Sequence, residues 1–327
     1  MVNSMPYSKG SLLFAPMEGV TDETYRLSIQ ELYPEWDYYH TDFLRVPTQG
    51  YYQFSRYQEH LGHRVLDDPS AIAKTGYQIL TTARAQTEHS VESIAKLPIT
   101  HLDLNLGCPS KKVNAHKGGA YLLEDLVELK RILRLIRERF PHHFSVKIRI
   151  GYKNTDNFEQ LLDTINESNV DSLIIHGRTR EQLYKGKADW SFIKKAVERM
   201  DIPVIGNGDI WSPEDIEAMF DITGCYAVMM GRGALKTPWL ASLYKEFGTN
   251  INEATLLEER RGRIPDYFNT LETNYREYTQ ATEDFILGRF KSFSRYLFED
   301  FDNADKLRSL FLRSQSLKEF NSYLDQI

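Results

Sequence analysis

Residues 101–123 include the side chains of this sequence that are most suited to chemistry. Leucine alternates with polar residues over His101–Leu106, which predicts a strand with one apolar face and one polar face that ends in Asn105. A Gly-Cys-Pro turn follows, and we expect its thiol, Cys108, to be exposed because such a turn is poor hydrophobic core. The segment therefore predicts the mouth of an active site.

Two kinds of reaction are open to the Cys108 thiol. With an ordinary pKa of about 8.5, a thiol keeps its proton near neutral pH and can donate it, whereas a thiolate would be a nucleophile. The other cysteine, Cys225, directly precedes the apolar run 226–230 and is predicted to be buried and inert. Because the sequence has only two cysteines, we expect no disulfide framework and a reducing cytoplasm. Because no CxxC or HExxH spacing occurs, we expect no metal.

Polar side chains also stand near the carboxyl ends of other apolar runs, where active sites of parallel α/β proteins lie. Lys147 and Arg149 alternate with apolar residues over 144–151. A lysine inside a protein is costly unless it is paired, so Lys147 requires either a structural ion pair or a cofactor that becomes anionic. The further polar residues at such ends are Gln78, His176, Arg178, Asn207 and Asp209.

Two glycine-containing segments indicate a phosphate site. Gly206-Asn207-Gly208-Asp209 and Gly231-Arg232-Gly233 follow the last two apolar runs of the first 240 or so residues, the usual phosphate-binding place of an α/β barrel. Arg232 would add a bidentate contact to the phosphate.

Eight apolar runs that alternate with helical patterns would position these residues. Their number, over roughly 240 residues, predicts an α/β fold of the (β/α)8 barrel type. An open doubly wound sheet is the alternative, and it is disfavoured because no GxGxxG opens a helix after the first run. The predicted strands are 12–17, 38–44, 73–80, 101–107, 144–151, 172–179, 203–210 and 226–233, and the predicted helices include 122–140, 158–168, 190–200 and 212–220.

The pattern changes near residue 248, after which charged and aromatic helical stretches follow without strand signals. We therefore predict a barrel domain over 1–247 and an all-helical domain over 248–327. The net charge of −6 excludes bulk attraction to nucleic acid, so RNA binding would need a local basic patch. No apolar run approaches about 18 residues, so we expect neither secretion nor a membrane span.

Seven motifs in order resemble those of tRNA-dihydrouridine synthases, and the resemblance covers essentially the whole chain. These motifs are Ala15-Pro16-Met17-Glu18-Gly19-Val20-Thr21-Asp22, Asn105-Leu106-Gly107-Cys108-Pro109, Gly119-Ala120 before Leu122-Leu123, Val146-Lys147-Ile148-Arg149, His176-Gly177-Arg178-Thr179, Asn207-Gly208-Asp209-Ile210 and Met230-Gly231-Arg232-Gly233.

The resemblance implies an FMN-dependent barrel enzyme with a helical tRNA-binding domain. NADPH would reduce the flavin, which would deliver hydride to C6 of a tRNA uracil, and Cys108 would protonate C5. Lys147 would then find its partner at the electron-rich N1/C2 edge of the reduced flavin. The implied cofactor-binding residues are Pro16, Met17, Gln78, Lys147, His176, Asn207, Gly208, Asp209, Gly231 and Arg232.

The resemblance also implies contacts to tRNA. Asn105 would position the base, and Arg178 and Tyr184 would join it. Residues 41–46 and 286–298 are similar to the bacterial C-type members, which modify uridine 16 in the D loop, although Asp42 stands where those members usually have Glu. Phosphate contacts are expected from Arg289, Lys291 and Arg295, and the site would be ringed by Lys111, Lys112, Lys117, Arg180, Lys185 and Lys187. Residues 111–117 would cover the flipped uridine, and we expect a monomer.

Two other functions are compatible with parts of this sequence. A flavin barrel that acts on a free pyrimidine, such as a dihydroorotate-type dehydrogenase, shares a cysteine or serine in a similar loop, but it needs no helical platform after residue 248. A tRNA-binding protein without catalysis would have no need of Cys108, Asn105 and Lys147.

Overall fold

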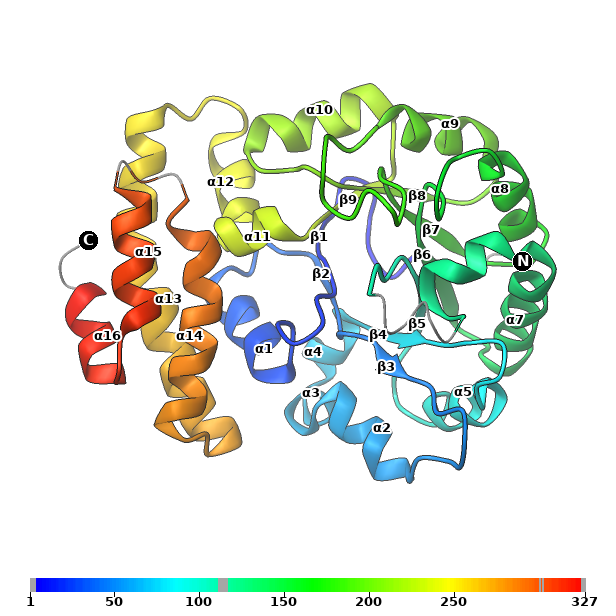
Figure 1. Ribbon diagram of the computed structural model, residues 1–327, viewed down its shortest axis with the longest axis horizontal. Helices are drawn as coiled ribbons and strands as arrows, with labels where there is room; N and C mark the ends of the chain where they lie inside the picture. The colour runs from blue at the N-terminus through cyan, green and yellow to red at the C-terminus, as the bar shows by residue number, and fades with distance from the viewer. Residues whose placement is uncertain (1–3, 111–116, 300, 302, 325–327) are drawn as a thin grey trace. The chain divides into compact units, whose positions relative to one another are not determined.

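The computed structural model describes residues 4–110, 117–299, 301 and 303–324. The predicted flap over 111–117, together with Lys111 and Lys112, therefore lies outside the described residues except for Lys117. The chain divides into two compact units (Figure 1). The barrel unit comprises residues 1–23, 36–210 and 215–231, and the helical unit comprises 24–35, 211–214 and 232–327.

The barrel unit contains a closed sheet of eight parallel strands, which confirms the predicted fold. β1 pairs with β9 on one side and with β2 on the other, and β2 also pairs with β4, so the sheet closes on itself. The strands are β1 (Leu12–Phe14), β2 (Tyr38–His40), β4 (Thr75–Leu80), β5 (His101–Leu106), β6 (His143–Arg149), β7 (Ser172–His176), β8 (Val204–Asn207) and β9 (Ala227–Met230).

The predicted strand over 38–44 is divided in the structure into β2 and a short β3 (Leu44–Arg45), which also pairs with β4. The reason lies at Thr41, between the two pieces. Its hydroxyl oxygen accepts the backbone N–H of Gln78 at 2.9 Å, in place of a main-chain carbonyl of the ladder. A side-chain hydrogen bond therefore interrupts the strand without leaving a buried N–H unpaired.

Helices lie outside the strands (Figure 1). The predicted helix over 122–140 begins later than expected, because residues Gly119–Glu124 form the 3-10 turn η1 and the Asp125 side chain then accepts the backbone N–H of Glu128 as an N-cap. The helices of this layer are α2 (Phe54–Leu61), α3 (His63–Asp67), α4 (Pro69–Ala73), α5 (Thr87–Ile94), α7 (Leu126–Arg139), α8 (Phe158–Asn166), α9 (Ser191–Arg199) and α10 (Pro213–Thr223).

The register of the parallel strands places polar residues in layers. His101 is paired with His143, Asp103 with Ser145, and Asn105 with Lys147, each two residues further along β5 and β6. Because successive side chains of a strand point to opposite faces, these pairs share one face of the sheet. The apolar residues between them, such as Leu102 and Leu104, are fully buried on the other face.

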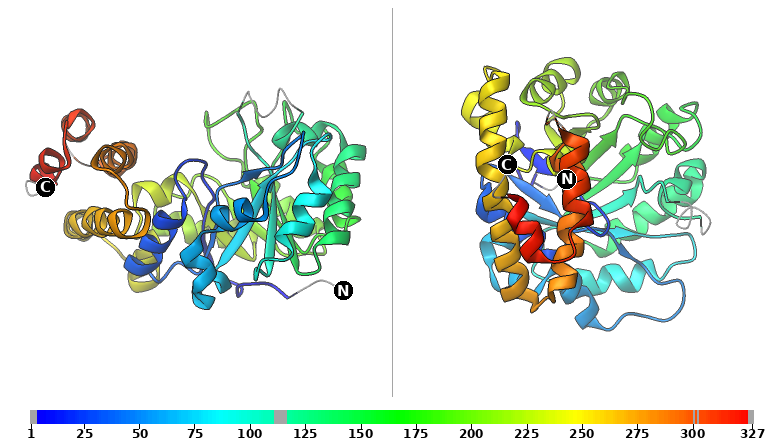
Figure 2. Two further views of the ribbon diagram at one scale, coloured as in Figure 1. Left: turned by 90° about the horizontal axis from the view of Figure 1, so that it is seen from below. Right: turned by 60° about the vertical axis from the view of Figure 1, so that its left-hand side comes forward.

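The helical unit packs around aromatic side chains. The rings of Phe268, Phe290 and Phe320 are mutually in contact, with centroid distances of 4.8 to 5.2 Å. Figure 2 (right) shows α13 (Glu253–Thr279) beside α14 (Glu283–Leu297). The other helices of the unit are α1 (Glu23–Leu32), α11 (Arg232–Lys236), α12 (Leu240–Phe247), α15 (Ala304–Arg313) and α16 (Leu317–Leu324).

The helical C-terminal region was predicted, but the inclusion of α1 in the same unit was not. The Tyr25 and Tyr267 hydroxyls are 3.2 Å apart, and Asn274 donates to the Ser28 hydroxyl at 3.0 Å. The domain border at 247/248 stays a prediction, because packing into compact units does not test where an independent domain begins. Among the described residues, no helix is both long enough and apolar enough to traverse a bilayer.

Candidate active site at the carboxyl ends of the barrel strands

Cys108 is held in a turn directly after β5. The Oδ1 atom of Asn105 accepts the backbone N–H of Gly107 at 3.1 Å and that of Cys108 at 2.9 Å. The expected exposure of the thiol is wrong: Cys108 is 7% exposed and packs against Phe43 and Leu80. The turn is therefore part of the barrel's packed mouth.

The surroundings of Cys108 favour the protonated thiol. Burial raises the pKa of Cys108, and the nearby Glu18 carboxylate raises it further, while Arg45 and Arg149 act in the opposite direction. A thiol with a raised pKa holds its proton at neutral pH. Of the two reactions that the sequence left open, the site therefore favours proton donation. Cys225 is 2% exposed, as predicted.

A line of hydrogen bonds runs from Asn105 into the barrel. Asn105 donates through Nδ2 to Gln78 Oε1 at 2.8 Å, and Gln78 donates through Nε2 to Asp103 Oδ2 at 2.6 Å. The hydroxyl of Ser145 donates to the other oxygen of Asp103. Gln78, Asp103 and Ser145 are all fully buried. Sequence reasoning singled out Gln78 and Asn105 but missed that Asp103 anchors them, although its place on the polar face of β5 was a signal.

Lys147 faces the same mouth. Its Nζ donates to Asn207 Oδ1 at 3.2 Å, so the partner provided by the protein is a neutral amide and not the ion pair considered from the sequence. Burial lowers the pKa of Lys147 to about 8, and the positive charge of Arg149 contributes. Asn207 is oriented by its own donation to the Met229 carbonyl at 2.7 Å. A partly buried ammonium with a neutral hydrogen-bond partner suits a site for an anionic group.

The strand end at β8 requires glycine. Gly208 has φ of +120°, and a Cβ there would lie 2.8 Å from the His176 ring and 2.9 Å from the Ala188 side chain. A side chain at this position would therefore collide with the loop after β7, and the predicted phosphate-binding role of Gly208 stays a prediction.

Arg178 and Asp209 are paired with each other in the structure. Arg178 NH1 and NH2 donate to the two Asp209 oxygens at 2.8 and 2.6 Å, and the Asp209 carboxylate also accepts the Ala188 N–H at 2.7 Å. Arg178 NH1 lies 3.3 Å from His176 Nε2 as well. The predicted tRNA contact of Arg178 and the predicted cofactor contact of Asp209 stay predictions.

Arg149 links the cysteine turn to the loop after β7. Its guanidinium donates to the carbonyls of Gly107 at 2.9 Å, Thr179 at 2.9 Å and Leu183 at 2.8 Å. It also lies over the Tyr184 ring at 5.5 Å. Sequence analysis placed Arg149 at the mouth without a role. Its position two residues after Lys147 on the same face of β6 was the available signal.

The remaining predicted cofactor residues stand at the expected strand ends. Pro16 and Met17 follow β1, and the Thr21 hydroxyl accepts the Met17 N–H at 3.0 Å. Gly231 follows β9, and Arg232, which begins α11, lies over the Trp211 ring at 4.9 Å within the helical unit. Nothing in these contacts tests the predicted roles.

The predicted tRNA contacts fall in both units. In the barrel unit Tyr184 is 52% exposed, and Lys185 and Lys187, which follow it in the same loop, are exposed too. Lys117, which comes before η1, is also exposed. In α14, Arg295 is exposed, whereas Arg289 donates to the Tyr275 hydroxyl at 2.9 Å and lies over the Phe293 ring at 4.9 Å. Lys291 is partly buried. Arg295 is therefore the most accessible of the three predicted phosphate contacts in α14.

A cluster deeper in the barrel has the spacing of a metal site. Potential ligand atoms of His40, His101 and Asp103 all lie within 4.8 Å of one another. Burial lowers the pKa of His40 to about 3 and that of His101 well below its ordinary value, so both rings are neutral. However, both nitrogens of His101 and both oxygens of Asp103 already have protein hydrogen-bond partners. The absence of a metal stays an expectation.

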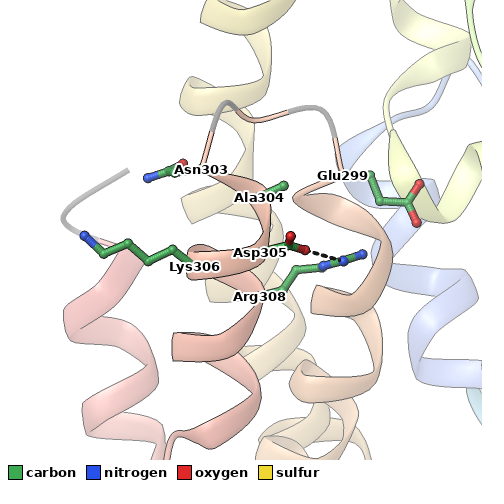
Figure 3. Close-up of a pocket in the computed structure, with 6 residues that line it drawn as sticks. All are labelled: Glu299, Asn303, Ala304, Asp305, Lys306 and Arg308. Carbon is green, nitrogen blue, oxygen red and sulfur yellow. Dashed lines mark hydrogen bonds and ion pairs between the residues drawn. The ribbon is translucent and has the colours of Figure 1, made fainter.

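The helical unit has a pocket that is lined by residues from the segment 299–308 and by none of the barrel residues described above. Figure 3 shows it beside the start of α15, where the Arg308 guanidinium donates to Asp305 at 2.9 Å. Its lining is Glu299, Asn303, Ala304, Asp305, Lys306 and Arg308, and includes no predicted site residue.

The closed barrel, its partly buried Lys147 and the buried Cys108 thiol at the strand ends define a (β/α)8-barrel enzyme. A model of the dihydrouridine synthase (Dus) family matches residues 13–327. The chain belongs to this family.

Relatives of similar length support the family. The tRNA-dihydrouridine(16) synthase of Escherichia coli K12 is 31% identical over 306 residues, covering 90% of this chain and 91% of the relative. The Haemophilus influenzae protein of the same name is 28% identical over 323 residues, covering 96% and 99%.

One solved structure, a 2-naphthoyl-CoA reductase in complex with 2-naphthoyl-CoA, is similar with a TM-score of 0.54 and 10% identity. The match covers 73% of this chain and 50% of that one, so this chain spans about half the length of the reductase. This similarity supports the barrel fold alone.

Proposed function

We propose that this enzyme reduces a D-loop uridine of tRNA, U16, to 5,6-dihydrouridine, with FMN as cofactor and NADPH as reductant. The observation that carries the proposal is the Cys108 thiol, kept protonated by burial and fixed by Asn105 at the mouth of the barrel. The names of the relatives support tRNA as substrate and position 16 as the target.

The residues at the strand ends fit a flavin phosphate cofactor. Lys147 is partly buried with a neutral amide as hydrogen-bond partner and would meet the electron-rich edge of the ring, and Gly208 would offer its backbone to the phosphate. Gln78 lies on β4 and His176 on β7, the strand between β6 of Lys147 and β8. When bound in its reduced form, FMN would supply the hydride that C6 of the uracil requires.

The chain's own residues supply the proton and the orientation. Reduction of the C5=C6 double bond adds one hydride and one proton, so the uracil needs an acid at C5. The Sγ–H of Cys108 gives that proton and becomes a thiolate, which solvent then reprotonates. Asn105 positions the thiol, because its Oδ1 accepts the two N–H groups of the turn, and its place beside that turn would let it contact the base.

The target uridine must leave its stack to reach the mouth, and the rim residues suit that task. Tyr184 is exposed and lies against Arg149, so a base can stack on it. Lys185 and Lys187 follow Tyr184 in the same exposed loop. In the helical unit, Lys291 and Arg295 of α14 would offer further phosphate contacts. We propose that the enzyme works as a monomer in the cytoplasm, where tRNA is available.

The test combines a spectrum with an assay. The purified protein is expected to show bound flavin, and to restore dihydrouridine to tRNA from a strain that lacks dihydrouridine-16 synthase. Cys108→Ala should bind flavin and lose the activity, while Cys225→Ala, the other buried cysteine, should retain it. Bound flavin without any change in tRNA dihydrouridine would overturn the proposal and favour a free pyrimidine as substrate.

A further inference from the structure

Asp103 is a carboxylate in the interior of the barrel with no exposure to solvent. Both of its oxygens accept hydrogen bonds, one from Ser145 and one from Gln78 Nε2. Burial raises its pKa to about 6, and the hydrogen bonds and Lys147 limit that rise, so Asp103 is ionised at neutral pH. An ionised carboxylate can only accept hydrogen bonds, so each neighbour must turn a donor toward it.

This requirement fixes the orientation of two side-chain amides in succession. Because Gln78 must point Nε2 at Asp103, its Oε1 faces Asn105 and accepts from Nδ2. Asn105 then turns Oδ1 toward the backbone N–H groups of Gly107 and Cys108. If the Gln78 amide turned over, its Nε2 would face the Nδ2 of Asn105, two donors with no acceptor between them.

A second arm of hydrogen bonds ends on the same carboxylate from the opposite direction. Ser145 gives its proton to Asp103, so its oxygen accepts from His101 Nε2 at 2.8 Å. His101 Nδ1 then accepts from the Tyr38 hydroxyl at 3.1 Å. We call Ser145, His101 and Tyr38 the second arm, and Gln78 and Asn105 the active-site arm. The hydrogen bonds of the second arm do not reach the cysteine turn, so the second arm offers a matched control for the active-site arm.

We propose that Asp103 is a positioning residue for the Cys108 turn, acting through the fixed orientations of the Gln78 and Asn105 amides. No proton passes along this arm, because the effect is on the direction in which the turn presents the thiol. The inference rests on the proposed role of Cys108 as proton donor. It assigns a function to the carboxylate that the barrel buries at Asp103.

The experiment compares Asp103→Leu, Asp103→Asn and Ser145→Ala in the full-length, flavin-loaded protein. Asp103→Leu removes the acceptor of the active-site arm, and a displaced thiol should lower kcat on tRNA about 100-fold with little change in KM. Ser145→Ala keeps the carboxylate and the Gln78 arm, so kcat should stay close to wild type. Asp103→Asn should fall between them, because its Oδ1 can still accept from Gln78 if its Nδ2 faces Ser145.

A second readout follows Cys108 without any tRNA. The alkylation rate of the peptide that contains Cys108, measured with iodoacetamide and mass spectrometry, should rise about ten-fold in Asp103→Leu because the turn opens more often. Ser145→Ala should leave that rate unchanged. This measurement does not depend on dihydrouridine formation, so it separates failure of the positioning role from failure of the proposed function.

Two results would overturn the assignment. One is a folded Asp103→Leu protein with wild-type kcat and alkylation rate. The other is a Ser145→Ala protein as impaired as the Asp103 variant, which would make the cluster a structural part of the core. If Asp103→Leu does not fold, the comparison of Asp103→Asn with Ser145→Ala decides by the same two criteria.

Discussion

Arg178 and Asp209 form a two-pronged ion pair at the ends of β7 and β8, with N–O distances of 2.8 and 2.6 Å. Arg178 is 2% exposed, and its guanidinium also donates to the carbonyls of Lys185 and Gly186. The pair therefore fastens the loop that carries Tyr184 to the strand end predicted to bind phosphate.

Removing one partner of this pair should destabilise the protein. Asp209→Asn is expected to lower the free energy of unfolding by about 3 kcal/mol, because it leaves the buried guanidinium without its counter-charge. Denaturant unfolding monitored by circular dichroism would measure this. The surface pair Arg199–Asp163, with side chains 39% and 48% exposed, is the control, and Asp163→Asn should leave the midpoint unchanged. Equal midpoints for the two variants would contradict the expectation.

The titration of Cys108 should respond in opposite directions to two neighbours. Burial and Glu18 raise the pKa of Cys108, and Arg45 lowers it. The pH at which alkylation is half-maximal should therefore lie above that of a free cysteine, fall in Glu18→Gln and rise in Arg45→Met. Mass spectrometry of the Cys108 peptide over a pH series measures it. Shifts of the same sign in both variants would show that the change acts through structure and not through charge.

Much of the site followed from the sequence for a simple reason. Period-two alternation placed Asn105 and Lys147 on the polar face of their strands, Asn207 stood at the end of its apolar run, and parallel strands bring their carboxyl ends to one mouth. The Lys147–Asn207 hydrogen bond shows two of those residues together.

The hydrogen-bond partners of the predicted site residues could not be predicted from the sequence. The sequence shows at which end of a strand a residue stands, but not which neighbouring side chain it contacts. Arg178 and Asp209 were given different ligands, yet they bind each other. The burial of Cys108 depends on Phe43, which directly precedes β3, and on Leu80 at the end of β4, and both are distant from Cys108 in the sequence. The packing of α1 with the C-terminal helices is likewise a tertiary contact that no local pattern indicates.

Replacement of Arg149 by lysine should impair the enzyme even though the positive charge is kept. Its planar guanidinium donates to three carbonyls in two loops, and a lysine could satisfy at most part of that set. Arg149→Lys is therefore expected to lower kcat on tRNA by about 10- to 100-fold through displacement of the cysteine turn. Arg139→Lys, at a partly exposed surface cluster with Glu88 and Glu138, is the control and should keep wild-type kinetics. A wild-type kcat for Arg149→Lys would show that charge alone suffices.

Lys147 should make stability depend on pH in the flavin-free protein. Burial lowers its pKa from 10.5 to about 8, so between these values the unfolded chain binds a proton that the folded protein has released. Stability that depends on Lys147 therefore rises as the pH increases from 8 toward 10.5. At pH 7 the buried charge costs up to about 3 kcal/mol, so Lys147→Met should be more stable than wild type there, and the gap should narrow above pH 8. Denaturant unfolding of both apoproteins at pH 7 and pH 9.5 tests this, and a gap that widens with pH would contradict it.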